Sequence, residues 1–362
     1  MEQDRLRHLI VGWAGLVLIM SGCTSSPTPN RQVVEAPLVP FGDLFVLQDT
    51  IRLDPAVVVG SVDFLDINQE GQLLVTDRIS GGTYLFDALG KKARMFSADT
   101  CLPETEDSPY SGRFVGGERF LLVGGGGSVV LFDASGRCIA SQSMTDRPME
   151  WATAACSVND TLFVLPDFIP VSPPVVVAYS LDYERLGTTG IDGPAFPVLN
   201  TTSRGFWGRA MECFDDGPYY KYLEWEDARP VRPYDSLAQV HPTFFARRTE
   251  DLPGDVGALD RVDALRAFPI NAGLYGIDGQ TRMVVYWDLH EKWHIESQQY
   301  IGIGVVSNAG RFPARSTLSS VVPIGAANGY IYSVGANELM SDGDVGNPVL
   351  IRYKFIPPSV SP

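Results

Sequence analysis

The feature of this sequence that most restricts its fold is a strand-like segment that is repeated six times. Each copy ends in an aromatic residue and has an aliphatic or β-branched residue three positions earlier. The endings are Phe86-Asp87, Phe132-Asp133, Tyr179-Ser180, Tyr234-Asp235, Trp287-Asp288 and Tyr353-Lys354, with their aromatic residues 46, 47, 55, 53 and 66 positions apart. Repeats of about 40 to 50 residues are typical of propellers and solenoids.

A hairpin-turn signal precedes each of these strands, and a β-rich run follows each turn. The turns are Asn68-Gln69-Glu70-Gly71, Gly116-Gly117-Glu118, Asn159-Asp160, Asp215-Asp216-Gly217, Asn271-Ala272-Gly273 and Ala327-Asn328-Gly329. Two copies of the repeated strand also end in a turn of the form Asp-x-x-Gly, at residues 87–90 and 133–136. There the carboxylate is expected to accept backbone N–H groups and the glycine to supply a positive φ.

Each repeat therefore predicts four antiparallel strands, named A to D from the axis outward. The chain is expected to be all-β, a six-bladed β-propeller with four-stranded antiparallel blades over residues 43–357 and a short tail at 358–362. The sixth repeat ends after its third strand, and the strand-like residues 45–53 are available to complete it. Such closure removes an open sheet edge, whereas a solenoid, the alternative, would need a cap at each end.

The best copy of the repeat combines Val75-Thr76-Asp77 with Tyr84-Leu85-Phe86-Asp87-Ala88-Leu89-Gly90. These residues resemble the NHL-like six-bladed propellers, and especially the six-bladed propeller lipoproteins of Bacteroidota-type bacteria. The resemblance covers about residues 43–356 and weakens in repeats four to six, which carry long insertions. It implies a fold and a location in the cell envelope, not a shared reaction.

The N-terminus has the layout of a signal peptide over residues 1–22. Arg5 and Arg7 precede an apolar run at 9–20, and Ser21-Gly22-Cys23 follow it. The run has twelve residues, whereas a membrane-spanning helix needs about 20. Small residues directly before a cysteine resemble the lipobox of bacterial lipoproteins, which implies acylation of Cys23; the alternative is an ordinary secretory signal.

Residues 23–42 are expected to form a lipidated tether, because the stretch after Cys23 is polar and proline-containing. Thr24, rather than aspartate, follows the cysteine, and by resemblance to the sorting rule of Gram-negative lipoproteins this points to the outer membrane. The formal net charge of −15 argues against nucleic acid as a partner. The expected partners are the membrane, through the N-terminal lipid, and a peptide, glycan or envelope protein.

A ligand site is expected on the face that carries the B–C and D–A connections, because the long insertions fall there and binding sites concentrate on loops of rigid scaffolds. The candidate residues mix aromatic side chains with charges of both signs. They are Arg78, Trp151, Asp167, Trp207, Arg209, Trp225, Glu226 and Glu338.

Residues His290-Glu291-Lys292-Trp293-His294 match the zinc-protease pattern H-E-x-x-H. That pattern works on a helix, where the two histidines share one face. Here it is expected to fall in a C–D hairpin after the third strand of the fifth repeat, with no helix to offer a third ligand. No metal site and no catalytic residue are therefore predicted.

A binding protein is the favoured functional class, and no cofactor is expected. The alternative is a calcium-dependent, lactonase- or lyase-like hydrolytic propeller, of the kind that holds its metal near the axis. Calcium uses oxygen ligands and is not excluded, but the chain has no compact D-x-D-x-D motif and no G-x-S-x-G nucleophile elbow.

Four cysteines follow Cys23, an even number that suits an oxidising compartment. Cys156 and Cys213 occupy equivalent positions on neighbouring A strands and are the expected disulfide. Cys101, in a D–A connection, and Cys138, near the opposite face, are expected to lie too far apart, since bonded cysteines need Cα atoms within about 7 Å. Unpaired buried thiols are the alternative.

Overall fold

A computed structural model describes residues 34–102, 109–116, 119–124, 128–142, 152–166, 175–182, 184–190, 211–215, 217–220, 229–230, 242–243, 270–287, 301–307, 310–337 and 346–359. Residues 35–236 and 242–362 belong to one compact unit, which contains every helix and strand discussed below apart from Val34. Among the described residues, no helix is long and apolar enough to span a membrane.

Three four-stranded antiparallel sheets follow one another along the first half of the chain. Their strands are β3 (Phe64–Ile67), β4 (Leu73–Asp77), β5 (Gly82–Phe86) and β6 (Arg94–Phe96); β7 (Pro109–Val115), β8 (Arg119–Gly124), β9 (Val129–Phe132) and β10 (Cys138–Gln142); and β11 (Ala152–Val158), β12 (Thr161–Pro166), β13 (Val175–Ser180) and β14 (Arg185–Gly190). Each sheet is paired in chain order, as the repeat predicts. Each blade is named below by its first strand.

Three further sheets follow in the second half. They comprise β15 (Met211–Phe214), β16 (Gly217–Tyr220) and β17 (Arg229–Pro230); β19 (Ile270–Asp278), β20 (Thr281–Trp287), β21 (Ile301–Ser307) and β22 (Arg315–Ser319); and β23 (Pro323–Ala327), β24 (Tyr330–Val334), β25 (Val349–Phe355) and β2 (Phe45–Arg52). A two-stranded sheet pairs β1 (Val34–Glu35) with β18 (Pro242–Thr243).

The all-β propeller with four-stranded antiparallel blades is confirmed, but the expected count of six such blades is corrected. Within the described residues, five sheets have four strands, and the β15 sheet has three. Proline explains part of the difference: Pro218 and Pro230 lie in β16 and β17, and proline cannot donate a hydrogen bond to a neighbouring strand. The two-residue β17 is consequently the edge of that sheet in the described chain.

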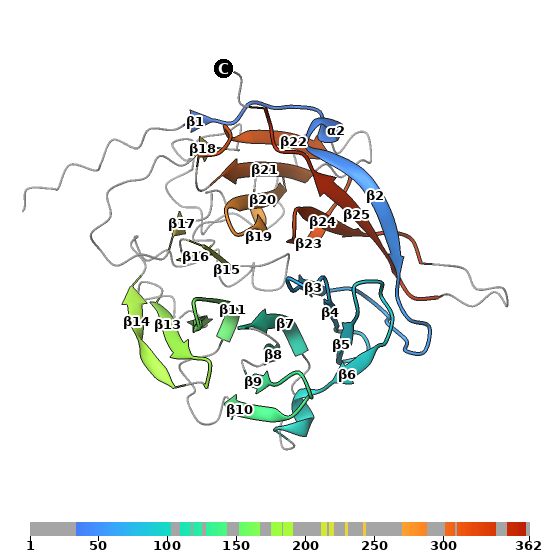
Figure 1. Ribbon diagram of the computed structural model, residues 1–362, viewed down its shortest axis with the longest axis vertical. Helices are drawn as coiled ribbons and strands as arrows, with labels where there is room; N and C mark the ends of the chain where they lie inside the picture. The colour runs from blue at the N-terminus through green and yellow to red at the C-terminus, as the bar shows by residue number, and fades with distance from the viewer. Residues whose placement is uncertain are drawn as a thin grey trace, which may run out of the picture. The chain divides into compact units, whose positions relative to one another are not determined.

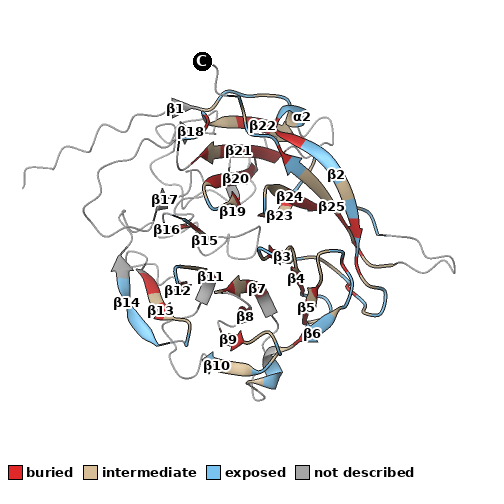
Figure 2. Ribbon diagram, viewed as in Figure 1, coloured by how far each residue is buried: buried red, intermediate tan, exposed pale blue. Residues whose placement is uncertain are grey.

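The first strand of every sheet lies on the inside of the propeller. β3, β7, β11, β15, β19 and β23 each contact the next strand in this series, and β23 contacts β3, so the six strands form a closed ring (Figure 1). Buried residues concentrate on these inner strands and their neighbours (Figure 2). Between the β3 and β7 blades, for example, Phe96 packs edge-on against Phe120 at 4.4 Å between ring centroids.

The predicted closing strand is confirmed. β2 pairs antiparallel with β25, from Phe45 opposite Phe355 to Arg52 opposite Val349. Asp49 on β2 accepts a hydrogen bond of 2.8 Å from Nε of Arg352 on β25, which adds a charge-assisted contact to the strand pairing. The last blade is therefore held together by residues about 300 positions apart in the chain.

The fold begins earlier than residue 43. Segment 36–39 runs beside β22, where Val39 N donates to Ser316 O at 2.8 Å and Ser316 N donates to Pro37 O at 2.9 Å. The short helix α2 (Phe41–Leu44) then leads into β2. Part of the segment expected to be tether thus belongs to the propeller.

The two Asp-x-x-Gly turns form as predicted. Asp87 Oδ1 accepts the backbone N–H groups of Leu89 and Lys91 at 3.0 and 2.9 Å. Gly90 has a φ of +77°, and a Cβ there would lie 2.6 Å from Arg52 O, so the turn also needs glycine for its close approach to β2.

The strand assignment of the fifth repeat was wrong. Asn271-Ala272-Gly273 is an irregularity within β19, not a turn, because the register to β20 shifts between Asn271 and Gly273. The turn lies at Gly279-Gln280, and the strand that ends at Trp287 is the second of its blade rather than the third. Residues 288–300 therefore form the B–C connection of the β19 blade.

Candidate functional site

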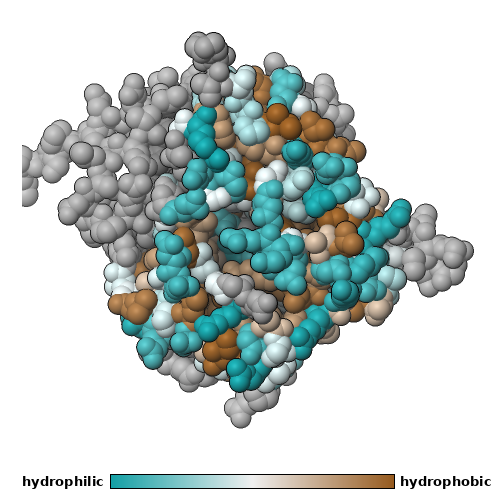
Figure 3. Space-filling model, viewed as in Figure 1, coloured by the Kyte–Doolittle hydropathy of each residue, from teal (hydrophilic) through white to brown (hydrophobic). Residues whose placement is uncertain are grey.

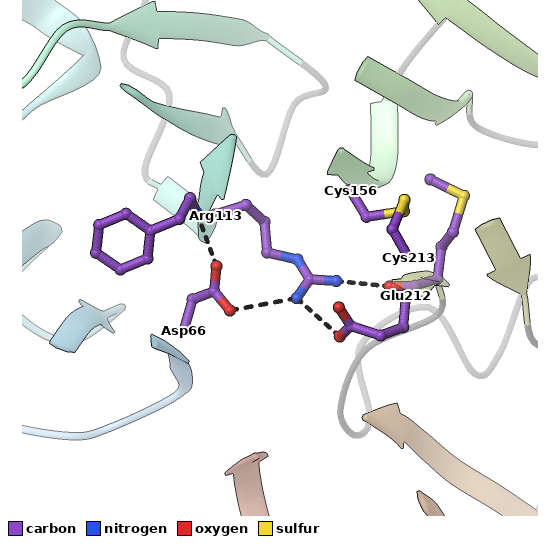
Figure 4. Close-up of polar contacts among 7 residues, drawn as sticks. Asp66, Arg113, Cys156, Glu212 and Cys213 are labelled. Atoms are coloured by element: carbon purple, nitrogen blue, oxygen red, sulfur yellow. Dashed lines mark hydrogen bonds and ion pairs between the residues drawn. A yellow bond between two sulfur atoms is a disulfide. The ribbon is translucent and has the colours of Figure 1, made fainter. Parts of the chain in front are cut away.

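The inner strands bring three charged side chains together inside the ring. Arg113 on β7 is buried, and its Nη1 lies 3.2 Å from Glu212 Oε2 on β15 and 3.5 Å from Asp66 Oδ1 on β3 (Figure 4). Its Nη2 also donates a hydrogen bond to the carbonyl oxygen of Met211. One guanidinium thus connects three different sheets.

This contact crosses the interior of the ring. β7 and β15 are not neighbours in the series of inner strands, because β11 lies between them and contacts both. The side chain of Arg113 must therefore reach past β11 to meet Glu212. The Phe64 ring lies 5.4 Å from the Arg113 guanidinium carbon and adds a cation–π contact.

Each charged group of this central network has a partner of opposite charge or a hydrogen bond. Asp66 Oδ2 accepts the backbone N–H of Phe114 at 2.7 Å, in addition to the ion pair with Arg113. Burying charges is costly unless they are paired and hydrogen-bonded. The network is therefore best described as a compensated internal ion cluster.

Sequence reasoning missed the central network, although the chain carries a signal for it. Three of the predicted inner strands contain one charged residue among mostly apolar ones: Asp66 between Leu65 and Ile67, Arg113 before Phe114, and Glu212 between Met211 and Cys213. Charges of opposite sign at such positions suggest pairing across the axis, because an isolated buried charge is strongly unfavourable. Which strands face one another depends on the tertiary structure.

A disulfide lies directly beside the central network. Cys156 on β11 and Cys213 on β15 are bonded, with Cα atoms 5.5 Å apart, and this is the pair expected from their equivalent strand positions. Cys213 follows Glu212 in the chain, so the bond fixes the strand that carries one of the two carboxylates (Figure 4). It connects the β11 blade with the β15 sheet.

The expectation for the other two cysteines was wrong. Cys101 and Cys138 form a second disulfide, with Cα atoms 5.9 Å apart. The connection after β6 does not stay on one face of the propeller. It packs inward, so that Cys101 and Leu102 contact the apolar cluster between the β3 and β7 blades, where Cys138 begins β10.

The loop face of the β3 blade is organised by two aspartates. Asp77, at the end of β4, is buried and accepts backbone N–H groups of Gly60 at 2.6 Å and Ile79 at 2.9 Å. Asp63 accepts the backbone N–H of Arg78 at 2.8 Å and the hydroxyl hydrogen bond of Ser61. These bonds connect the D–A segment before β3 to the B–C loop between β4 and β5.

Asp77 is ionised in this setting. Burial acts to raise its pKa, but hydrogen bonds from Gly60, Ser80 and Ser61 outweigh burial and hold the pKa of Asp77 below its ordinary value. A carboxylate that accepts several N–H groups is stabilised in its charged form. Asp77 is therefore a fixed negative group that shapes the loops rather than a proton donor.

Of the ligand-site candidates predicted from the sequence, the structure describes Arg78. Its exposed position in the β4–β5 loop is on the face where the long connections were expected. Cys23 and the candidates Trp151, Asp167, Trp207, Arg209, Trp225, Glu226 and Glu338 lie outside the described residues. Of the predicted ligand site, only the position of Arg78 is therefore described.

Residues 290–294, with the H-E-x-x-H pattern, also lie outside the described residues. In sequence they fall between the second and third strands of the β19 blade, β20 and β21, and not between its third and fourth strands as expected. The described parts of the chain contain no group of three or more His, Cys, Asp or Glu side chains arranged to hold a metal ion.

Comparison with known proteins supports the fold. No family model and no curated protein sequence matches the chain. A candidate exported protein from Bacteroides fragilis has a similar structure, with a TM-score of 0.60 at 10% sequence identity, over 90% of this chain and 99% of that one. Streptogramin B lyase matches with a TM-score of 0.45 at 11% identity over 86% and 87% of the two chains.

BamB from Moraxella catarrhalis matches with a TM-score of 0.39 at 11% identity, over 86% of this chain and all of that one. At such low identities, structural similarity reports the fold alone. The similarity to the Bacteroides fragilis protein therefore supports the fold over nearly the whole of both chains. The comparisons assign no ligand or reaction to the central network or to the loop face.

Proposed function

We propose that this β-propeller is a lipid-anchored protein of the bacterial cell envelope that binds a peptide, a glycan or another envelope protein. In this proposal acylated Cys23 holds the protein at the outer membrane of a Gram-negative cell. The B–C and D–A connections supply the binding surface, and the sheets are the rigid scaffold that positions it. A six-bladed arrangement, with the β15 sheet as an incomplete blade, is part of the same proposal.

The observation that carries the proposal is the central Arg113 network. In a metal-dependent propeller hydrolase, the carboxylates near the axis are ligands of the metal. Here the axial carboxylates Asp66 and Glu212 already pair with a guanidinium that sits between them. The Arg113 guanidinium occupies the place between the carboxylates where a metal ion would bind. This favours a structural role for the network over a calcium-dependent reaction.

The order of the loop face supports binding as well. Asp77 and Asp63 connect the segment before β3 to the B–C loop through hydrogen bonds. These bonds fix the backbone at the tip of the loop. Ile79 stands at that tip with 77% of its surface exposed. An exposed apolar side chain on an ordered loop is a suitable contact for a partner.

Photo-crosslinking in cells of the native host tests which face binds. A photoreactive amino acid is placed at Ile79, on the loop face, and in a matched variant at Leu89, which is 75% exposed in the C–D turn of the same blade. We expect a discrete crosslinked product from position 79 and none from position 89. Products from position 89 alone, or equally from both, would contradict the assignment of the binding face.

A further inference from the structure

The N-terminal strap, defined as residues 36–47, crosses the outer edges of two blades. Its first residues lie along β22, the outermost strand of the β19 blade, and its last residues begin β2, the outermost strand of the β23 blade. On its inner side Leu44 and Phe45 are buried, and the Phe41 ring packs 5.1 Å from the ring of Phe45. The strap is therefore a fixed part of the rim.

Most exposed side chains of the strap are apolar. Leu38, Val46 and Leu47 are exposed, with Val46 and Leu47 on opposite sides of β2 because successive side chains of a strand alternate. Exposed Ile356 lies next to the strap, since its N–H donates to Leu44 O at 2.8 Å. These four residues are called the rim patch. Figure 3 shows apolar surface over α2 and the start of β2.

The rim patch is also nearly free of charge. Asp43 is the one charged residue in the sequence of the strap, in a chain with 20% charged residues and a formal charge of −15. Lys354, which stands opposite Val46, offsets it. Such a local composition is unusual for the surface of an acidic protein, and exposed apolar patches mark protein or membrane contacts.

The position of the rim patch along the chain identifies its partner. Val34, the first described residue, stands eleven positions after Cys23, and eleven residues span at most about 40 Å in any conformation. A lipid on Cys23 would hold Val34, two positions before the strap, within that distance of the bilayer. Attachment of this kind makes even a weak second contact effective, because the two surfaces meet at a high local concentration.

We propose that the rim patch is a membrane-contact surface and that the propeller rests on the bilayer through its edge at β2 and α2. This inference relies on the proposed lipid anchor at Cys23. Contact through the outer strands leaves both the loop face and the turn face open, so a partner can reach the B–C and D–A connections while the protein is on the membrane.

The geometry of β2 disfavours strand addition by a partner protein at the same place. The register to β25 shifts between Leu47 and Asp49, which leaves Gln48 out of the regular pairing. A bulge of this kind twists an edge strand and hinders continuous pairing with a further strand. The groups of the rim patch that can contact a binding partner are therefore its apolar side chains, rather than its backbone.

Environment-sensitive fluorescence tests this proposal on the full acylated protein. The variants Leu47→Cys and Leu186→Cys are labelled with a nitrobenzoxadiazole dye, which is possible because Cys101, Cys138, Cys156 and Cys213 are in disulfides. Leu186 is a matched control: it is 60% exposed, against 61% for Leu47, and lies on β14, the outermost strand of the β11 blade. Both proteins are reconstituted in protein-free vesicles of zwitterionic phospholipid.

We expect a blue shift and stronger emission from the dye at position 47, quenched by spin-labelled acyl chains, and a water-like spectrum at position 186. Equal spectra at both positions would overturn the proposal. A blue shift at 47 in native membranes but not in protein-free vesicles would overturn it in favour of a protein partner. If the protein does not float with the vesicles at all, the proposed lipid anchor at Cys23 is wrong. Equal melting temperatures of the two variants show that neither is misfolded.

Discussion

Buried Arg113 and half-buried Glu212, 99 positions apart in the chain, form an ion pair that reaches across the inner strand β11. Asp66 approaches the same guanidinium from a third sheet. The pair thus joins β7 and β15, which are not neighbours in the ring of inner strands. Its removal should therefore disturb the closed ring as a whole.

Replacing Arg113 should destabilise the protein strongly. Arg113→Met keeps much of the side-chain volume but leaves buried Asp66 and half-buried Glu212 without their cation. Removing one partner of a buried ion pair typically costs about 3 to 5 kcal/mol. Arg137→Met is the control, because Arg137 forms an exposed ion pair with Asp133, and such pairs contribute about 0 to 1 kcal/mol. Urea unfolding measures the loss in free energy of unfolding of each variant relative to the wild type. Similar losses in both variants would contradict a stabilising role for the central network.

Both disulfides should be found by peptide mapping under non-reducing conditions, as Cys101–Cys138 and Cys156–Cys213. The latter encloses a 57-residue separation, and its loss in the double variant Cys156→Ser/Cys213→Ser should lower the free energy of unfolding by about 2 to 5 kcal/mol. Reductant should lower the melting temperature of the wild type more than that of this variant. Peptides linking Cys101 to Cys156 would contradict the described geometry.

Stability should depend on Asp133 at low pH. Its hydrogen bond from Ser135, together with the backbone N–H of Arg137, lowers the pKa of Asp133 to about 2. Because the folded-state pKa lies below the unfolded value of 3.8, the stabilisation is present above pH 3.8 and is lost as the pH falls through about 2. The stability difference between wild type and Asp133→Asn should therefore shrink from pH 5 to pH 2, and a difference that grows on acidification would contradict this assignment.

Lipidation should depend on Cys23 alone. The Cys23→Ser protein should no longer incorporate labelled palmitate or sediment with membranes, while its melting temperature stays that of the processed wild type, because residue 23 precedes the propeller. Continued palmitate labelling of this variant would show that the lipobox interpretation is wrong.

The H-E-x-x-H pattern should not bind zinc. In the strand order of the β19 blade it falls in the B–C connection and not in a C–D hairpin. The pattern still needs a helix to bring both histidines to one ion and a third ligand to complete the site. Elemental analysis of wild type and of His290→Ala/His294→Ala should show no stoichiometric zinc in either; one zinc per chain that disappears on mutation would reverse the assignment.

The sequence determined the local architecture of this protein. Strand ends such as Phe86-Asp87, the Asp-x-x-Gly turns and the spare strand at β2 are set by side-chain alternation and turn chemistry within a few residues, so they could be predicted. In the fifth repeat two turn signals competed. Gly279-Gln280 forms the turn, whereas Asn271-Ala272-Gly273 is an irregularity inside a nine-residue strand. Only the pairing of β19 with β20 decided which of the two signals became the turn.

For the central network and for the disulfide of Cys101, only the tertiary structure decided which distant groups meet. Arg113, Asp66 and Glu212 each look like an isolated charge in an apolar strand, and the disulfide of Cys101 depends on how one connection packs between two blades. Such contacts join residues tens of positions apart, and no local sequence pattern records which residues will meet. The closed ring of inner strands brings the charged side chains close together in its interior. They form ion pairs there because burying an unpaired charge would cost a large part of the free energy of folding.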